Sequence, residues 1–163
     1  MDQGENGRRT EEQKILLVDD HVVFRQGLSK LINSLPDYAV AGEAETLEQA
    51  ISALQNDCFS VAVVDLGLGG KVSTDAIEKL KSAKPELIVI ALSMREELEY
   101  VEQALRAGAV GYISKYEAAN EILPALNRVL RNKKYISETI KQRIVRRMAL
   151  GQRTSLDIQD LSN

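Results

Sequence analysis

Five polar side chains follow apolar stretches of this 163-residue chain and could act together: Asp19, Asp20, Asp65, Ser93 and Lys115. If the apolar stretches are parallel strands, their carboxyl ends meet at one edge of a sheet and bring these side chains together. Three neighbouring carboxylates repel one another unless a cation lies among them, and oxygen ligands favour Mg²⁺ (or Mn²⁺). An ammonium and a hydroxyl opposite them complete a cradle for a phosphoryl group. The pattern predicts a metal-assisted phosphoryl-transfer site.

The elements that must position these residues alternate along the chain. Residues 61–64 are typical of a strand buried on both faces, and further strands are predicted at 15–18, 38–42, 87–92 and 110–113. Apolar residues at helical spacing predict five helices, at 24–35, 46–54, around 77–80, at 96–106 and at 117–130. This alternation predicts a doubly wound α/β domain with a five-stranded parallel sheet and right-handed crossovers.

Each candidate residue also has a purely structural interpretation. Asp19 and Asp20 could cap the first helix, Asp65 could cap the turn after its strand, and Ser93 could be a further cap. Lys115 could be a solvated turn residue. All of these residues end predicted parallel strands, and this coincidence favours a shared site.

Composition sets the class of protein. The chain has 44% hydrophobic and 28% charged residues, which is ordinary for a globular domain. No apolar run approaches the roughly 20 residues of a membrane span, and no signal peptide is evident, so a cytoplasmic protein with no membrane contact is expected. One cysteine excludes an internal disulfide, and a single histidine excludes a Cys/His metal cluster.

The charge is unevenly distributed. Residues 1–127 carry 12 basic against 21 acidic side chains, whereas residues 128–153 carry nine basic side chains and only Glu138. Residues 1–13 are polar and predicted to be a disordered leader, and residues 154–163 a flexible tail. Between residues 132 and 153 we expect a linker with a basic amphipathic helix at 137–150, with Ser137 as its N-cap.

The segments ILLVDDHVVFRQGL, VAVVDLGL, VIALSM and AGAVGYISK closely resemble the receiver domain of two-component response regulators, which has a flavodoxin-like fold. The resemblance covers residues 14–131. It implies that Asp65 accepts phosphate from a sensor histidine kinase, and that Asp19, Asp20, Asp65 and the backbone carbonyl of Gly67 bind Mg²⁺. Such a domain is not an enzyme beyond its own phosphoryl transfer and dephosphorylation.

The same resemblance implies that Ser93 and Lys115 contact the phosphoryl oxygens and that Tyr112 is the aromatic switch residue. Its ring would turn inward when Ser93 moves toward the phosphate. Taken alone, Tyr112 could be an ordinary core residue. The loop LGLGGKVST and Met94 depart from the usual receiver pattern, so phosphorylation and hydrolysis rates do not carry over.

The phrase KKYISETIKQRIV followed by LSN resembles the NarL/FixJ group of regulators, in which a LuxR-type helix-turn-helix domain begins at this point. We therefore expect a transcriptional regulator whose DNA contacts lie in an output domain outside this sequence. One alternative is a stand-alone receiver that acts as an adaptor or phosphorelay, and homodimer formation is left open. Another is a flavodoxin-like enzyme, but VDDHVVF lacks the phosphate loop that a flavin nucleotide requires.

Overall fold

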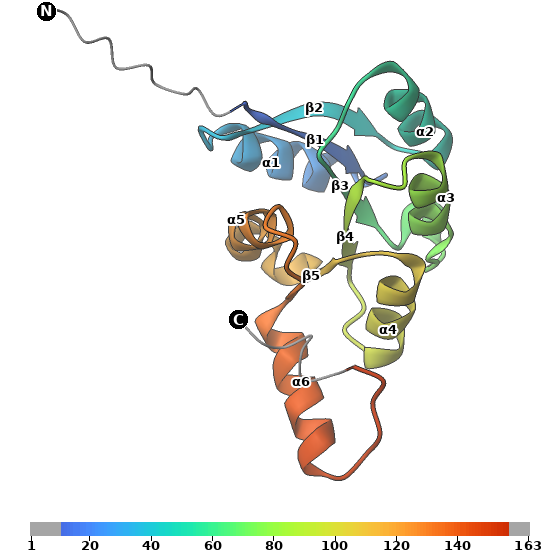
Figure 1. The fold of residues 1–163 in the computed structure, drawn as a ribbon, viewed down its shortest axis with the longest axis vertical. Coiled ribbons are helices and arrows are strands. Elements are labelled where there is room, and N and C mark those ends of the chain that lie inside the picture. The colour runs from blue at the N-terminus through green and yellow to red at the C-terminus, as the bar shows by residue number, and fades with distance from the viewer. Residues whose placement is uncertain (1–10, 157–163) are drawn as a thin grey trace, which may run out of the picture.

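The structure, a computed structural model, describes residues 11–156, which form one six-stranded parallel sheet between two layers of helices (Figure 1). The strands are β1 (Gln13–Val18), β2 (Tyr38–Ala44), β3 (Val61–Asp65), β4 (Ile88–Ser93), β5 (Gly111–Ser114) and β6 (Tyr135–Ile136). The helices are α1 (Val22–Asn33), α2 (Leu47–Asn56), α3 (Asp75–Ala83), α4 (Leu98–Ala107), α5 (Ala118–Val129) and α6 (Glu138–Ala149). Two short 3₁₀ turns lie at Leu68–Gly70 and Lys115–Glu117.

Helices cover both faces of the sheet. Helices α1 and α5 lie on one face, and α2, α3 and α4 lie on the other (Figure 1). In β1, Ile15 and Leu17 belong to the apolar core under α1 and α5, whereas Leu16 and Val18 belong to the core under α2, α3 and α4. A strand buried on both faces needs apolar residues at every position. The predicted doubly wound parallel fold is confirmed.

The sheet has six strands and not the predicted five, in the order β2-β1-β3-β4-β5-β6. In the additional strand, Tyr135 pairs with Gly111 and Ile136 pairs with Tyr112, both in β5. Backbone hydrogen bonds from Tyr135 N to Val110 O and from Ser137 N to Tyr112 O, both 3.0 Å, fix this register. Two residues are too few to show a strand period, so the sequence pattern assigned them to the linker.

Two helix boundaries bear on the site. Helix α4 begins at Leu98, although the apolar spacing predicted a start at residue 96, because Glu97 has an extended backbone with φ −67° and ψ 134°. It ends at Ala107, one residue beyond the predicted end, and is followed by Gly108 as its C-cap, whose φ of 115° is the left-handed conformation that glycine adopts most readily. Residues 94–97 therefore form a non-helical link between β4 and α4.

Both predicted flexible ends are shorter than expected within the described residues. Gln13, placed in the leader, is the first residue of β1. Leu156, placed in the tail, is buried in the core under α4. The rest of these two predictions, at 1–10 and 157–163, lies outside the described residues. Within residues 11–156, no helix combines the length and apolar character that a membrane span requires.

Candidate functional site

The predicted site lies at the carboxyl ends of β1 and β3. These strands are neighbours, but the chain leaves β1 toward β2 at the sheet edge and leaves β3 toward β4 on the other side. Such a reversal opens a crevice beyond the strand ends. Asp19 directly follows β1, Asp65 is the last residue of β3, and each is only 2% exposed.

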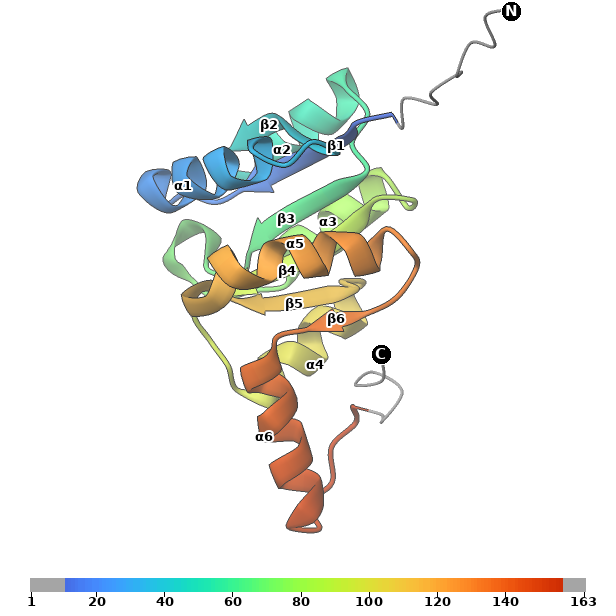
Figure 2. The same ribbon diagram turned by 90° about the vertical axis from the view of Figure 1, so that its left-hand side faces the viewer.

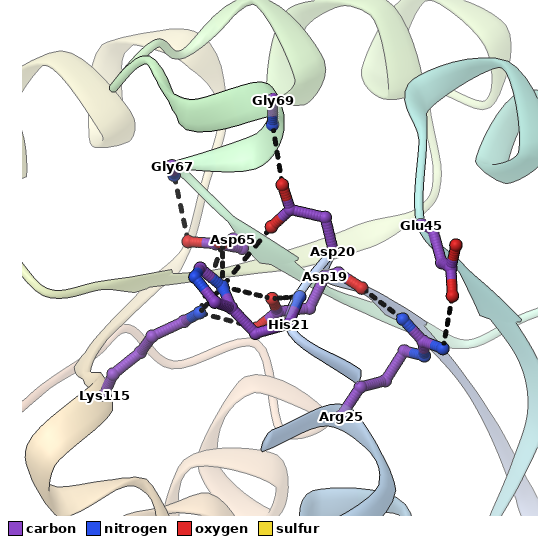
Figure 3. Close-up of polar contacts among 9 residues, drawn as sticks. All are labelled: Asp19, Asp20, His21, Arg25, Glu45, Asp65, Gly67, Gly69 and Lys115. Atoms are coloured by element: carbon purple, nitrogen blue, oxygen red, sulfur yellow. Dashed lines mark hydrogen bonds and ion pairs between the residues drawn. The ribbon is translucent and has the colours of Figure 1, made fainter. Parts of the chain in front are cut away.

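Lys115 joins these two aspartates. Its Nζ lies 2.7 Å from Asp19 Oδ2 and 3.2 Å from Asp65 Oδ2, as Figure 3 shows. Lys115 follows β5 directly and is itself buried, with Nζ 4.6 Å from the centre of the Phe24 ring. The structure therefore brings together the predicted acceptor, one predicted metal ligand and the predicted cation, which lie far apart in the sequence.

Asp20, which follows Asp19 and is partly exposed, is the third carboxylate of the site. Its Oδ2 accepts a 3.1 Å hydrogen bond from the backbone N–H of Gly69, which fastens the loop after β3 to the end of β1. Its other oxygen, Oδ1, is buried and makes no hydrogen bond within the described residues, although His21 Nδ1 lies 3.3 Å from it. A buried carboxylate oxygen without a donor is costly unless a cation binds it. This oxygen fits the predicted metal ion.

Gly67 lies where the prediction placed it, but the structure shows its other backbone group at the site. Its N–H donates a 2.9 Å hydrogen bond to Asp65 Oδ1, whereas its carbonyl accepts a 2.9 Å hydrogen bond from Gly70 N. A carbonyl oxygen has two lone pairs, so that contact leaves one for a metal ion. The role of the Gly67 carbonyl as a ligand stays a prediction.

His21 was not among the predicted site residues, yet it lies in the cluster. Its Nδ1 is 3.0 Å from Asp19 Oδ1, 3.3 Å from Asp20 Oδ1 and 3.6 Å from Asp65 Oδ2 (Figure 3). One ligand atom from each of these four residues lies within 4.8 Å of the others. The sequence signal for His21 was its position directly after the aspartate pair. His21 occupies the N-cap position of α1, but its side chain caps no backbone N–H there.

Asp19 has a separate contact at each of its two carboxylate oxygens. Its Oδ1 accepts a 2.8 Å hydrogen bond from His21 N at the start of α1, as a cap would, while its Oδ2 faces Lys115. The Asp19 backbone is held by Arg25, a buried residue of α1. Arg25 Nη1 donates to the Asp19 carbonyl at 2.5 Å, and its other nitrogens pair with Glu43 and Glu45 at 3.1 and 3.0 Å.

Ser93 and Tyr112 lie on the neighbouring strands. Asp65 pairs with Leu92 in the sheet register, so Ser93 is one position beyond it at the same edge. Ser93 Oγ accepts a 2.9 Å hydrogen bond from Arg95 N. The ring of Tyr112 is fully buried, and its hydroxyl donates a 2.7 Å hydrogen bond to Arg95 O. Burial raises the pKa of Tyr112 to about 12, which keeps this hydroxyl protonated as a donor. Ser93 and Tyr112 therefore both bind the backbone of Arg95, which lies between β4 and α4.

The surroundings of Asp65 disfavour its charge. Burial raises the pKa of Asp65 above its ordinary value; the Gly67 N–H lowers it, the Asp19 carboxylate raises it, and Lys115 lowers it. The net direction is upward. A phosphorus nucleophile must be ionised, so a cation near this carboxylate would favour the reactive form.

This upward pKa shift predicts that Asp65→Asn stabilises the protein at neutral pH. Between the unfolded pKa of about 3.9 and the higher folded pKa, the native state holds the Asp65 proton while the unfolded state has released it. The free energy of unfolding of the wild type therefore falls as pH rises through this window. The Asp65→Asn variant has no carboxyl group at this position, so its free energy of unfolding does not fall for this reason. Urea unfolding should show a gain for the variant at pH 7 and none at pH 3.5. The exposed Asp75→Asn is the control, and a gain of the same size at both pH values would contradict the prediction.

Residues 15–127 match the family model of the response regulator receiver domain, and the chain belongs to this family. Response regulator GacA of Pseudomonas protegens is 30% identical over 132 residues, which cover 81% of this chain and 62% of GacA. Response regulator UvrY of Escherichia coli K12 is 30% identical over 138 residues, 85% of this chain and 62% of UvrY. The chain thus spans about 62% of the length of these curated relatives.

Solved structures support the same assignment. A two-component response regulator of the LuxR family from Aurantimonas sp. superposes with a TM-score of 0.79 at 27% identity, covering 85% of this chain and 99% of that one. The isolated receiver domain of RcsB from Salmonella enterica serovar Typhimurium, with the phosphomimetic BeF₃⁻, has a TM-score of 0.74 at 23% identity and covers 81% of this chain and 98% of that one. This second likeness shows the fold alone.

Proposed function

We propose that this receiver domain accepts a phosphoryl group on Asp65 from a histidine kinase, with Mg²⁺ bound beside it, and so controls a transcriptional output. The observation that carries the proposal is the buried contact of Lys115 Nζ with both Asp19 and Asp65. Membership of the receiver family and the likeness to a LuxR-family regulator support the donor and the output.

Each side chain would have a separate task. Asp65 attacks phosphorus with an ionised oxygen, forming an acyl phosphate while the bond from phosphorus to the donor breaks. Lys115 and Ser93 would receive the phosphoryl oxygens, Lys115 by charge and Ser93 by its hydroxyl. Asp19, Asp20, Asp65 and the Gly67 carbonyl would hold the metal ion. The ion supplies positive charge that offsets the developing charge on the phosphoryl oxygens.

The direct test is intact mass spectrometry after incubation with Mg²⁺ and acetyl phosphate. The wild-type chain should gain the mass of one phosphate, and Asp65→Asn should gain none because an amide is not a nucleophile for phosphorus. Asp75→Asn, an exposed aspartate at the start of α3, is the matched control and should behave as the wild type. A phosphate gain that persists in Asp65→Asn would place the acceptor elsewhere and refute the proposal.

A second test concerns the metal ion. Because Mg²⁺ would bind the folded chain alone, 100 times its dissociation constant should raise the free energy of unfolding by about 2.7 kcal/mol. Asp20→Asn removes a ligand whose Oδ1 is otherwise without a donor, so most of the gain should be lost. Urea unfolding with and without Mg²⁺ measures both values. Equal gains in Asp20→Asn and the Asp75→Asn control would show that the ion binds outside this cluster.

A further inference from the structure

The side chain of His21 turns into the acidic cluster, although it starts a helix at the surface. The side chain is 64% exposed, so burial does not hold the ring in this orientation. Its Nδ1 lies 3.0 Å from Asp19 Oδ1, 3.3 Å from Asp20 Oδ1 and 3.6 Å from Asp65 Oδ2 (Figure 3). The carboxyl ends of β1, β3 and β5 lie on the same side of the sheet, as Figure 2 shows, so the residues that follow these strands meet there.

The helix start does not explain this orientation. At the start of α2, Thr46 caps its own helix, because its Oγ1 accepts a 3.2 Å hydrogen bond from a backbone N–H. Ser137 was predicted to cap α6, but its hydroxyl makes no capping hydrogen bond and accepts instead from Ser114 N at 2.9 Å. The His21 ring also makes no capping hydrogen bond, and the backbone N–H of His21 is held by Asp19 Oδ1 at 2.8 Å without it. The ring therefore has no capping task.

The oxygens that the ring faces are short of positive charge. Asp20 Oδ1 and Asp65 Oδ2 are buried and make no hydrogen bond within the described residues, and the Asp65 side chain is only 3% exposed. Lys115 Nζ lies 3.2 Å from both Asp65 Oδ2 and His21 Nδ1. Because an ammonium has only donors, its contact with Nδ1 requires a lone pair on that nitrogen. Carboxylate oxygens repel such a lone pair, and a second cation between them would turn the repulsion into attraction.

The spacing of these atoms fits a shared metal ion. One ligand atom from each of four residues, Asp19, Asp20, His21 and Asp65, lies within 4.8 Å of the others. Ligands about 2.1 Å from one ion lie at most about 4.2 Å apart, so small side-chain movements would bring all four onto it. This donor set differs from the all-oxygen set that Mg²⁺ prefers, because an imidazole nitrogen suits Zn²⁺, Ni²⁺ and related divalent transition-metal ions better.

We propose that His21 Nδ1 is a further ligand of the metal ion beside Asp65, and that this nitrogen gives the site a preference for divalent transition-metal ions over Mg²⁺. The inference rests on the metal site of the proposed function and specifies which ions that site selects. The bound form is the neutral ring with its proton on Nε2, because Nδ1 must offer its lone pair. His21 is the only histidine of the chain, so any contact between an imidazole of this chain and a metal ion involves this ring.

Isothermal titration calorimetry of the full chain with CoCl₂ and with MgCl₂ tests this preference. His21→Ala should weaken Co²⁺ binding at least about 10-fold, since even groups that only support a metal ligand contribute that much, and its effect on Mg²⁺ should be much smaller. His21→Asn offers an amide oxygen in place of the nitrogen, so it should lose the preference for Co²⁺ and keep Mg²⁺ binding. Val22→Ala, at the neighbouring exposed position, is the matched control and should leave both affinities unchanged. Equal effects of His21→Ala on the two ions, or none on either, would overturn the proposal.

The imidazole ¹⁵N spectrum of the wild-type chain tests the same contact without a variant, because a single histidine gives one pair of ring signals. Adding ZnCl₂ should shift the Nδ1 signal strongly and the Nε2 signal little, and MgCl₂ should shift the Nδ1 signal less. If the wild type bound neither ion, this proposal and the proposed metal site would both be wrong. A phosphate gain on Asp65 with Mg²⁺, together with an Nδ1 signal that does not respond to ZnCl₂, would overturn this proposal alone.

Discussion

Replacing Lys115 by methionine should slow phosphate uptake from acetyl phosphate by about 100-fold or more. Removing one preorganised donor from an enzyme active site slows the reaction by a similar factor. Lys115 Nζ lies 2.7 Å from Asp19 and 3.2 Å from Asp65, in a buried position where water cannot replace it. Methionine keeps the length of the side chain but loses the charge that would meet the incoming phosphoryl oxygens. Without it, the two buried carboxylates also repel each other more strongly, which favours the unreactive protonated form of Asp65.

Two variants make this measurement specific. Lys79→Met removes one exposed lysine of α3 and should leave the uptake rate unchanged. Lys115→Arg keeps the charge but presents a planar guanidinium, so an intermediate rate is expected. Circular dichroism and urea unfolding establish whether each variant is folded. A folded Lys115→Met that takes up phosphate at the wild-type rate would remove Lys115 from the proposed mechanism.

Arg25→Ala should lower the free energy of unfolding by about 3 kcal/mol, the range for breaking a buried charged contact. Arg25 is buried and donates to the Asp19 carbonyl, and its guanidinium pairs with Glu43 and Glu45. Alanine would leave that carbonyl without this donor and the two glutamates without this countercharge. Since the lost carbonyl contact belongs to Asp19, the affinity for Mg²⁺ should fall as well.

The neighbouring exposed Gln26→Ala is the control for Arg25→Ala and should change the free energy of unfolding by less than about 0.5 kcal/mol. Arg25→Lys keeps one charge but has a single donor group, so it should recover only part of the loss. Urea unfolding gives the stabilities, and the Mg²⁺ dependence of unfolding gives the affinities. If Arg25→Ala were as stable as Gln26→Ala, the contacts of Arg25 would not contribute to the fold.

The sequence was most informative where local pattern and topology agree. Runs such as 61–64 are apolar at every position because both sheet faces are covered, and a polar residue can enter only where the strand ends. For this reason the sequence predicts that Asp19, Asp65 and Lys115 lie at one edge of the sheet. Parallel strand direction then requires them to meet.

What the sequence did not predict depends on contacts between distant residues. The side chain of His21 reaches Asp65 and Lys115 because β3 and β5 bring these two residues beside the end of β1. Helix α6 is docked on the domain, where Glu96 and Glu99 pair with arginines of α6 that lie more than 40 residues later in the chain. Helical spacing identifies α6 as amphipathic, but it does not say which surface its apolar side covers.

Strand β6 changes where this domain ends. Its two residues hydrogen-bond to β5, and the chain that follows contributes Ile140, Ile144 and Leu156 to the core under α4. A truncation after residue 131, the end expected from the family resemblance, would remove β6 with its hydrogen bonds to β5. It would also expose the part of the core that these later residues cover. A piece of this chain that keeps the whole of this described core therefore extends through Leu156.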